Sequence, residues 1–248
     1  MKLRRAVLLG VGSLLVASAG YVEASKEPAG QTIDSGALVV YVNGQRVADE
    51  SFTIVQTTTG SVVNSQLREE GSGNKATQTS QMQLTSAGEL IRYEWHELSP
   101  NRTELELLPN DQFLTERVTV NPGEKPTEQP FLLPTSTVVL DNNFFIHREL
   151  LVWRYLAQNC KADPGQPLRC TSGPTSFGAV VPQDRLSMRV SLEPVGREKV
   201  QIKGAVRELP RFALKFEGGE WALWLDDQDH YKIVKISIPS EKTEVVRD

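Results

Sequence analysis

The residues that could do chemistry are few in this chain, and their spacing forms none of the common catalytic or metal-binding motifs. Of the three histidines, we expect His96 on the wet face of a strand, His147 on the polar rim of a helix and His230 in a turn. The sequence holds no His-x-His, no His-Glu-x-x-His and no cysteine cluster, the spacings that bring metal ligands together. It also lacks the Gly-x-Ser-x-Gly elbow and the Gly-rich loops that cradle phosphates. We therefore predict a protein that is not an enzyme and uses no metal or cofactor.

Carboxylates are abundant, and we expect them to be solvated. Glu104 and Glu106 share one strand face, and three aspartates crowd the predicted turn Asp226–Asp229. A weak calcium site in this turn is one alternative, although the spacing of an EF-hand loop is not present. A hydrolase whose site assembles from distant residues is another, and it would bring His147, a carboxylate and a hydroxyl into one cleft.

Aromatic side chains give the strongest indication of a ligand-binding site. A predicted helix carries one set and the predicted strands carry another, so the two sets could meet between helix and sheet. That interface is either an ordinary packed core or a slot for an acyl chain or another apolar ligand. The residues that would line the slot are Tyr93, Trp95, Phe144, Phe145, Trp153, Tyr155 and Trp221. Trp224 falls on the opposite face of its strand from Trp221 and is predicted to mark a patch that faces a partner.

The first 24 residues resemble an export signal. Three basic residues precede an apolar stretch from Ala6 to Ala17, which is shorter than the ~20 residues of a membrane-spanning helix. Two triplets of mostly small residues then suit cleavage, Ala17-Ser18-Ala19 and Val22-Glu23-Ala24. We expect an exported protein, periplasmic or secreted, that is soluble after cleavage.

The charge of the mature chain argues against nucleic acid as a partner. Cleavage after Ala24 removes three of the 27 basic and one of the 31 acidic residues, which leaves a net charge of −6. The remaining Lys and Arg are scattered, whereas binding to a phosphate backbone needs a basic patch.

Cys160 and Cys170 are the two cysteines of the chain. In an oxidising compartment, cysteines this close in sequence are expected to form a disulfide. The sequence therefore predicts a staple that closes the loop from Lys161 to Leu168.

The segment after the signal is predicted to hold a polar leader, residues 25–35, and then a single antiparallel β domain, residues 36–248. The strongest hairpin signal is Ala37–Val42, Asn43-Gly44 and Gln45–Val55, because Asn-Gly tolerates the positive φ angles of a type I′ turn. Further alternating segments follow at spacings typical of a meander, and the last predicted strand is Tyr231–Ile238.

One segment departs from the alternation of apolar and polar residues that is typical of strands. Asn142–Asn159 is rich in apolar residues and is predicted to form a helix of four to five turns, capped by Asp141 or a following asparagine. The Pro-rich stretches that bracket it, residues 121–134 and 161–182, are expected to be crossover loops. The predicted fold class is mainly β: a large coiled antiparallel sheet, a half-open barrel, wrapped around one long helix.

The opening hairpin Val40–Arg46 and the closing strands Ala222–Asp226 and Tyr231–Lys235 resemble those of a group of uncharacterised exported bacterial proteins. More loosely, the order of elements is similar to that of the periplasmic lipoprotein-carrier proteins. That resemblance implies an incomplete barrel around an apolar cavity. The carriers have several helices where this chain has one, and no binding residue is carried over.

These observations predict a non-enzymatic envelope protein that binds an apolar or lipidic ligand between sheet and helix. The alternative is a structural or interaction module of the envelope, with a fully packed core, that presents its sheet face or edge strands to another protein.

Overall fold

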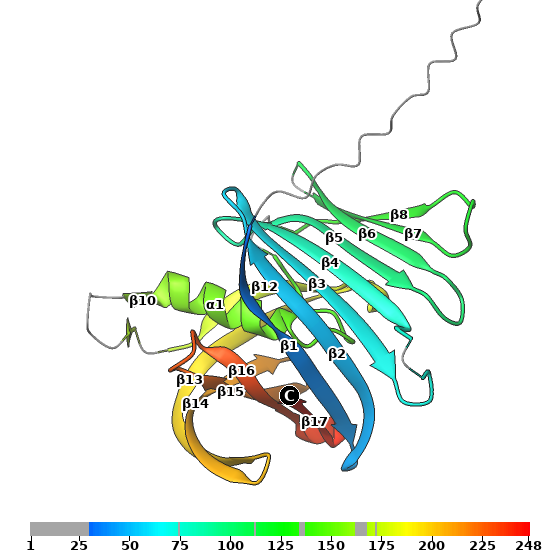
Figure 1. The fold of residues 1–248 in the computed structure, drawn as a ribbon. Helices are drawn as coiled ribbons and strands as arrows, with labels where there is room; N and C mark the ends of the chain where they lie inside the picture. Colours follow the sequence, from blue (N-terminus) through cyan, green and yellow to red (C-terminus); the bar gives the residue numbers. More distant parts are fainter. Residues whose placement is uncertain (1–29, 74, 112, 134–136, 162–167, 172) are drawn as a thin grey trace, which may run out of the picture.

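The computed structural model describes residues 30–248 apart from 74, 112, 134–136, 162–167 and 172. The predicted export signal and the first residues of the leader lie outside these residues. The described chain is mainly β, with one sheet of 15 strands, a two-stranded ribbon and one α-helix (Figure 1). The large sheet is not closed, and its end strands are β8 and β9. The predicted mainly β fold is thereby confirmed.

The first eight strands form an antiparallel meander in chain order. They are β1 (Gln31–Val42), β2 (Gln45–Gln56), β3 (Gly60–Glu69), β4 (Gln78–Thr85), β5 (Leu90–Glu97), β6 (Glu104–Asn110), β7 (Phe113–Thr119) and β8 (Thr127–Phe131). In the first hairpin, Asn43 and Gly44 have φ angles of 52° and 76°, which confirms the predicted turn.

The second half of the sheet runs back from its far edge toward β1. It consists of β9 (Val138–Val139), β12 (Thr175–Val181), β13 (Leu186–Ile202), β14 (Ala205–Phe216), β15 (Gly219–Asp226), β16 (Lys232–Ile238) and β17 (Thr243–Arg247). Neighbouring strands in the described chain are antiparallel except β9 and β12. Helix α1 (His147–Asn159) follows β9. The two-stranded ribbon consists of β10 (Cys160–Lys161) and β11 (Arg169–Cys170). Two short 3₁₀ helices are η1 (Pro182–Asp184) and η2 (Pro239–Glu241).

The two halves meet where the chain ends pair. β1 lies between β2 and β17, in a register that places Leu38 opposite Arg247 and Val42 opposite Thr243. β17 was not predicted, because it is only five residues long. β1 also begins at Gln31, inside the segment predicted as a polar leader. Asp34 explains the difference, since its carboxylate is buried against the cations Arg247 and Lys232.

Three further predictions about elements need correction. The stretches 121–134 and 161–182 are not only crossover loops, because they contain β8 and β12. Pro130 is compatible with β8 because this strand lies at the sheet edge, where a residue without N–H costs no ladder bond. The helix begins at His147 and not at Asn142, and its 13 residues make about three and a half turns.

Trp224 does not face a partner, and that prediction is wrong. Its side chain is buried in a second, smaller apolar cluster with Val200, Ile202 and Leu209, on the face of β15 opposite to Leu223. The three aliphatic residues come from β13 and β14, the 17- and 12-residue strands of one hairpin, whose register shifts near Gly196. Both faces of the sheet are thus covered in this region.

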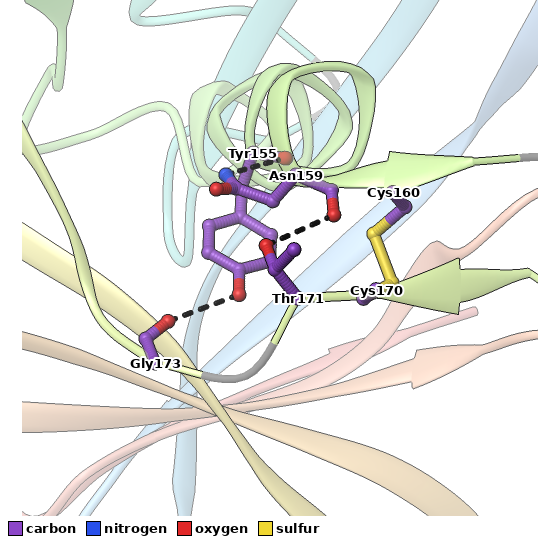
Figure 2. The surroundings of a disulfide bond; sticks show 6 residues. All are labelled: Tyr155, Asn159, Cys160, Cys170, Thr171 and Gly173. Carbon is purple, nitrogen blue, oxygen red and sulfur yellow. Dashed lines mark hydrogen bonds between the residues drawn. A yellow bond between two sulfur atoms is a disulfide. The ribbon is translucent and has the colours of Figure 1, made fainter.

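The disulfide between Cys160 and Cys170 is present, as predicted (Figure 2). The N–H and hydroxyl of Thr171 donate to the Asn159 carbonyl at 2.9 and 3.2 Å, and the Tyr155 hydroxyl donates to the Gly173 carbonyl at 3.1 Å. The ribbon therefore ties the end of α1 to the segment that leads into β12.

Replacing both cysteines by serine is expected to lower the free energy of unfolding by about 2.5–3 kcal/mol, because the short loop is no longer closed in the unfolded chain. Urea unfolding measures this difference. Reductant should lower the stability of the wild type by a similar amount and leave the double variant unchanged. Equal stability of the two proteins under oxidising conditions would contradict the prediction.

Candidate functional site

Two buried carboxylates hold the turn that leads into α1. Asp141 Oδ1 accepts the N–H groups of residues 143 and 144 at 2.7 and 3.2 Å. Glu50 Oε2, from β2, accepts those of residues 145 and 146 at 2.6 and 3.3 Å. Asp141 therefore caps a turn and not the helix, whose own N-cap, Ile146, has no side-chain hydrogen bond. Because side chains bind these four N–H groups in a non-helical turn, α1 starts later than its apolar residues indicate.

Asp141 also joins the turn to the sheet. Its Oδ2 accepts hydrogen bonds from the Tyr93 hydroxyl on β5 and from the Gln183 amide in η1. Burial raises the pKa of Asp141, although these donors favour the charged form. The pKa of Tyr93 is held well above its ordinary value by burial and by the charge of Asp141. Tyr93 thus remains a protonated donor.

His147 is buried, so its predicted position on a polar rim is wrong. Its ring packs edge-on against Tyr93 with 5.7 Å between centroids, and Nδ1 accepts the Asp141 N–H at 3.4 Å. Burial and the charge of Arg148 lower the pKa of the imidazole well below 6.5, so the ring is neutral. His147, Asp141 and the Tyr93 hydroxyl do cluster, but each is 0–1% exposed and a substrate could not reach them. This geometry does not support the hydrolase alternative.

Glu50 is buried with no cation within ion-pair distance in the described structure, and its pKa is about 8. Burial is the largest cause of the rise, and the Phe145 N–H opposes it. An unfolded glutamate titrates near 4.5. Between these two values the folded protein keeps a proton that the unfolded chain releases, so stability is lost as pH rises.

Glu50→Gln is expected to remove this pH dependence, because Gln can accept the same N–H groups without titrating. Relative to that of the wild type, the free energy of unfolding of the variant should rise with pH, by up to about 1.4 kcal/mol per pH unit between roughly pH 5.5 and 7.5. Urea unfolding at several pH values measures it. Glu70→Gln, which removes an exposed carboxylate, controls for the change in net charge. If the free energies of unfolding of wild type and Glu50→Gln change with pH in parallel, the raised pKa assigned to Glu50 is refuted.

Arg148 is the largest fully buried side chain in the described structure, with 2% of its surface exposed. Its Nη1 donates to the carbonyl oxygens of Asp141 and Phe144, the latter at 2.9 Å. The guanidinium lies 4.7 Å from the Trp221 ring centroid and 5.5 Å from that of Phe145, which is cation–π geometry. Burial lowers the pKa of Arg148 to about 10, and it is still charged at neutral pH.

A cavity of about 150 Å³ opens beside this guanidinium. Its apolar walls come mainly from β13, β14 and β15, and Arg148 is the cationic group among its lining residues. The apolar lining includes Leu140, Met188, Val190, Leu214, Phe216 and Trp221. A cavity of this volume holds a molecule about the size of benzene.

A second hollow, of about 500 Å³, lies beside Trp153 and Leu156 of α1. Ile33, Trp153 and Leu156 line its apolar part, and the Trp153 Nε1 donates to the His230 carbonyl oxygen at 2.9 Å. It holds one predicted ligand-binding residue and no buried charged group among its lining residues.

The seven predicted ligand-binding residues do not line one slot. Phe145 and Trp221 come together, with ring centroids 6.3 Å apart. Tyr93 and Phe144 instead pack on His147. Each of the other three has separate contacts: Trp95 donates to Gln78 at 2.9 Å, Tyr155 packs edge-on against Phe212, and Trp153 lines the second hollow.

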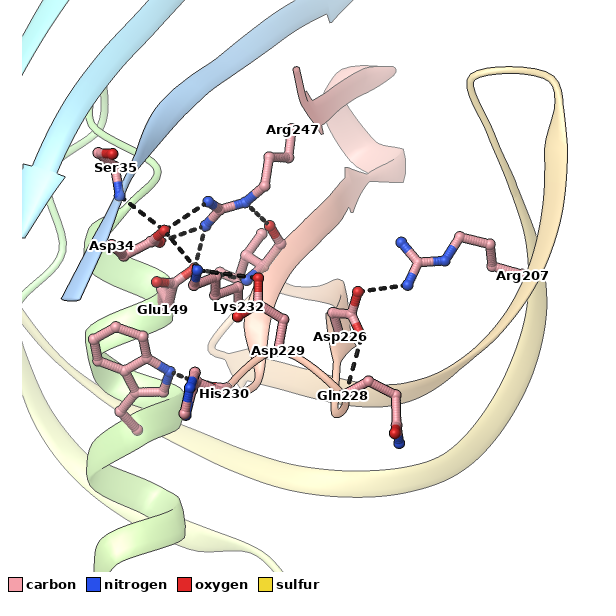
Figure 3. A network of polar contacts seen from close by, with 12 residues as sticks. Asp34, Ser35, Glu149, Arg207, Asp226, Gln228, Asp229, His230, Lys232 and Arg247 are labelled. Carbon is pink, nitrogen blue, oxygen red and sulfur yellow. Dashed lines mark hydrogen bonds and ion pairs between the residues drawn. The ribbon is translucent and has the colours of Figure 1, made fainter.

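A charged network fixes the first turn of α1 to the strands where the two halves meet (Figure 3). Arg247 of β17 lies 2.9 Å from Asp34 of β1 and 2.6 Å from Glu149 of α1, and its Nε donates to the Ile233 carbonyl. Glu149 in turn accepts the Ile233 N–H at 2.6 Å. Burial acts to raise the pKa of Asp34, but the bonds from Arg247 and Glu149 and the nearby cations lower it overall, whereas burial raises that of Glu149.

The acidic turn after β15 is occupied by ion pairs. Asp226 contacts Arg207 at 2.5 Å, Asp227 contacts Arg197 at 2.6 Å, and Asp229 contacts Lys232 at 3.0 Å. In the part of the chain that the structure describes, no group of three or more His, Cys, Asp or Glu side chains could hold a metal ion. The calcium alternative thus has no structural support.

Arg247→Met is expected to lower the free energy of unfolding by about 3–5 kcal/mol, because it leaves the buried Glu149 without a cation and the buried Asp34 with Lys232 alone. Thermal or urea unfolding measures the loss. Arg46→Met is the matched control: Arg46 also contacts two carboxylates, Asp49 and Glu70, but is half exposed, so a change within about 0.5 kcal/mol is expected. Similar effects of the two substitutions would contradict the role given to the network.

Arg148, Glu50 and the charged network were not predicted from the sequence. One signal was present: Arg148 and Glu149 stand at the start of a strongly apolar helix, and a charge on a buried helix face needs a partner from elsewhere in the fold.

Comparison with protein-family models, curated proteins and solved structures found no match to this chain. The resemblance to exported bacterial proteins and lipoprotein carriers therefore stays a prediction. Among the described helices, none has the length and apolar character needed to cross a membrane.

Proposed function

We propose that this chain is an exported, non-enzymatic protein of the cell envelope that binds a small apolar molecule in the cavity beside Arg148. The observation that carries the proposal is the cavity itself. Seven of its eleven lining residues are Met, Leu, Val, Phe or Trp, and such predominantly apolar walls are typical of sites for apolar ligands.

In this proposal the sheet forms a half-open barrel around α1. Residues of the helix and of the turn before it contact both halves of the sheet: Phe145 bonds to Glu50 of β2, Glu149 to β16 and β17, and Tyr155 packs on Phe212 of β14. The cavity that these contacts leave beside Arg148 is small, about 150 Å³. A ligand of benzene size, or one end of a longer chain, fits this space better than the large slot predicted from the aromatic residues.

Two features support export. The disulfide is typical of proteins that fold in an oxidising compartment. The sequence before the described residues has the charged, apolar and small-residue segments of an export signal.

Met188→Trp is expected to fill the cavity and block binding. Met188 lines the cavity and is partly exposed, so the larger ring can be accommodated without disrupting the core. Toluene should raise the melting temperature of the wild type and leave that of Met188→Trp unchanged. Leu186→Trp, on the same strand at an exposed position outside the cavity lining, should respond as the wild type does. No response of the wild type, or an equal response of Met188→Trp, would refute the proposal.

A second candidate function, an interaction module, is favoured by exposed apolar side chains around the edge strand β8. Phe113, Val120 and Leu132 have 43%, 50% and 74% of their surface exposed; Phe113 begins β7, and the other two directly follow β7 and β8. A photo-crosslinking residue at position 132 should then give one discrete adduct in the envelope. The same residue at position 206, whose valine is 70% exposed on another hairpin, is the control. The module is contradicted if position 132 gives no adduct or the same products as position 206.

A further inference from the structure

The charge of Arg148 indicates more about the class of ligand than the apolar walls of the cavity do. Arg148 is 2% exposed and has no carboxylate within 4 Å in the described part of the chain. Its Nη1 is bound to two backbone carbonyls, but its buried Nε has no hydrogen-bond partner. A buried donor on a cation is costly to leave unpaired.

Two buried acidic groups that act on Arg148, Glu50 and Asp141, do not supply the missing partner. Glu50 Oε2 is bound to the N–H groups of Phe145 and Ile146, and with a pKa of about 8 this carboxyl is protonated at neutral pH. Both oxygens of Asp141 are occupied by the turn, by Tyr93 and by Gln183. The guanidinium therefore retains an N–H donor, at Nε, that has no hydrogen-bond partner in the described chain.

Resting on the proposed function, we propose that the ligand is a small organic acid whose carboxylate binds Arg148 and whose hydrocarbon part packs on Trp221 and Phe216. A charge-assisted bond to a guanidinium is stronger than a neutral one, and it gains from the desolvated setting. The aromatic and aliphatic walls bury the remainder of such a molecule. The ligand class is thereby narrowed from apolar molecules to apolar carboxylates.

Two acidic side chains at the cavity act against this ligand. Asp184 and Glu241 are among the lining residues, and both are exposed, whereas Arg148 is buried. Asp184 accepts a hydrogen bond from the Asn142 amide at 2.7 Å. Their repulsion of an anion is screened by water and salt, so the buried cation dominates once the ligand has entered. Removing one of these charges, as in Glu241→Gln, should tighten the binding of a carboxylate about twofold to threefold.

The test compares benzoate with benzamide, which has nearly the same size and shape but no charge. The Trp221 Nε1–H is buried, without a hydrogen-bond partner, and belongs to a lining residue, so its ¹⁵N–¹H signal reports binding near neutral pH. We expect benzoate to bind the wild-type protein at least tenfold more tightly than benzamide. Arg148→Met should abolish this preference, and Arg148→Lys, which keeps the charge, should retain part of it.

The outcomes separate this inference from the proposed function. If benzamide or toluene binds as well as benzoate, the cavity is a site for neutral apolar molecules and the carboxylate inference is overturned. If none of the three probes binds, the proposed function fails as well. Because the comparison of benzoate with benzamide uses the wild-type protein, it decides the inference even if the Arg148 variants do not fold.

Discussion

The fold depends on one contact between the two ends of the described chain: the pairing of β1 with β17, fastened by Arg247. This pairing turns two meanders into one continuous sheet of 15 strands. At the same place the Arg247 guanidinium contacts both Asp34 and Glu149, so that a single side chain links β1, β17 and α1. Because these charged side chains are largely buried, removing one partner of the network is costly.

The position of the helix in turn shapes the candidate site. Glu149 fixes the helix to β16, while Glu50 and Asp141 hold the turn before it against the other half of the sheet. Arg148 stands between these anchors, and its side chain therefore points toward β15 and the rings of Trp221 and Phe145. Arg148 is held against the apolar walls of the cavity because the turn before it and Glu149 after it are fixed to different parts of the sheet.

Much of the fold could be predicted from local pattern, because alternation, Asn-Gly turns and paired cysteines act over a few residues. The first hairpin, the antiparallel meander and the disulfide are of this kind. The start of α1 and the existence of β17 depend on partners far away in sequence, such as Glu50 for the turn and Asp34 for Arg247. The candidate site was predicted only through its aromatic residues, of which Trp221 lines the cavity. The role of Arg148 could not be predicted, because it follows from tertiary anchors and not from spacing.

The central claim, that this protein carries a small apolar ligand beside Arg148, is tested most directly by what the protein holds when taken from its native cells. Wild type and Met188→Trp would be purified under mild conditions, extracted with organic solvent and compared by mass spectrometry. We expect a small acidic, apolar compound that is enriched in the wild type and depleted in the variant. Identical extracts, or an enriched compound that persists in Met188→Trp, would contradict it.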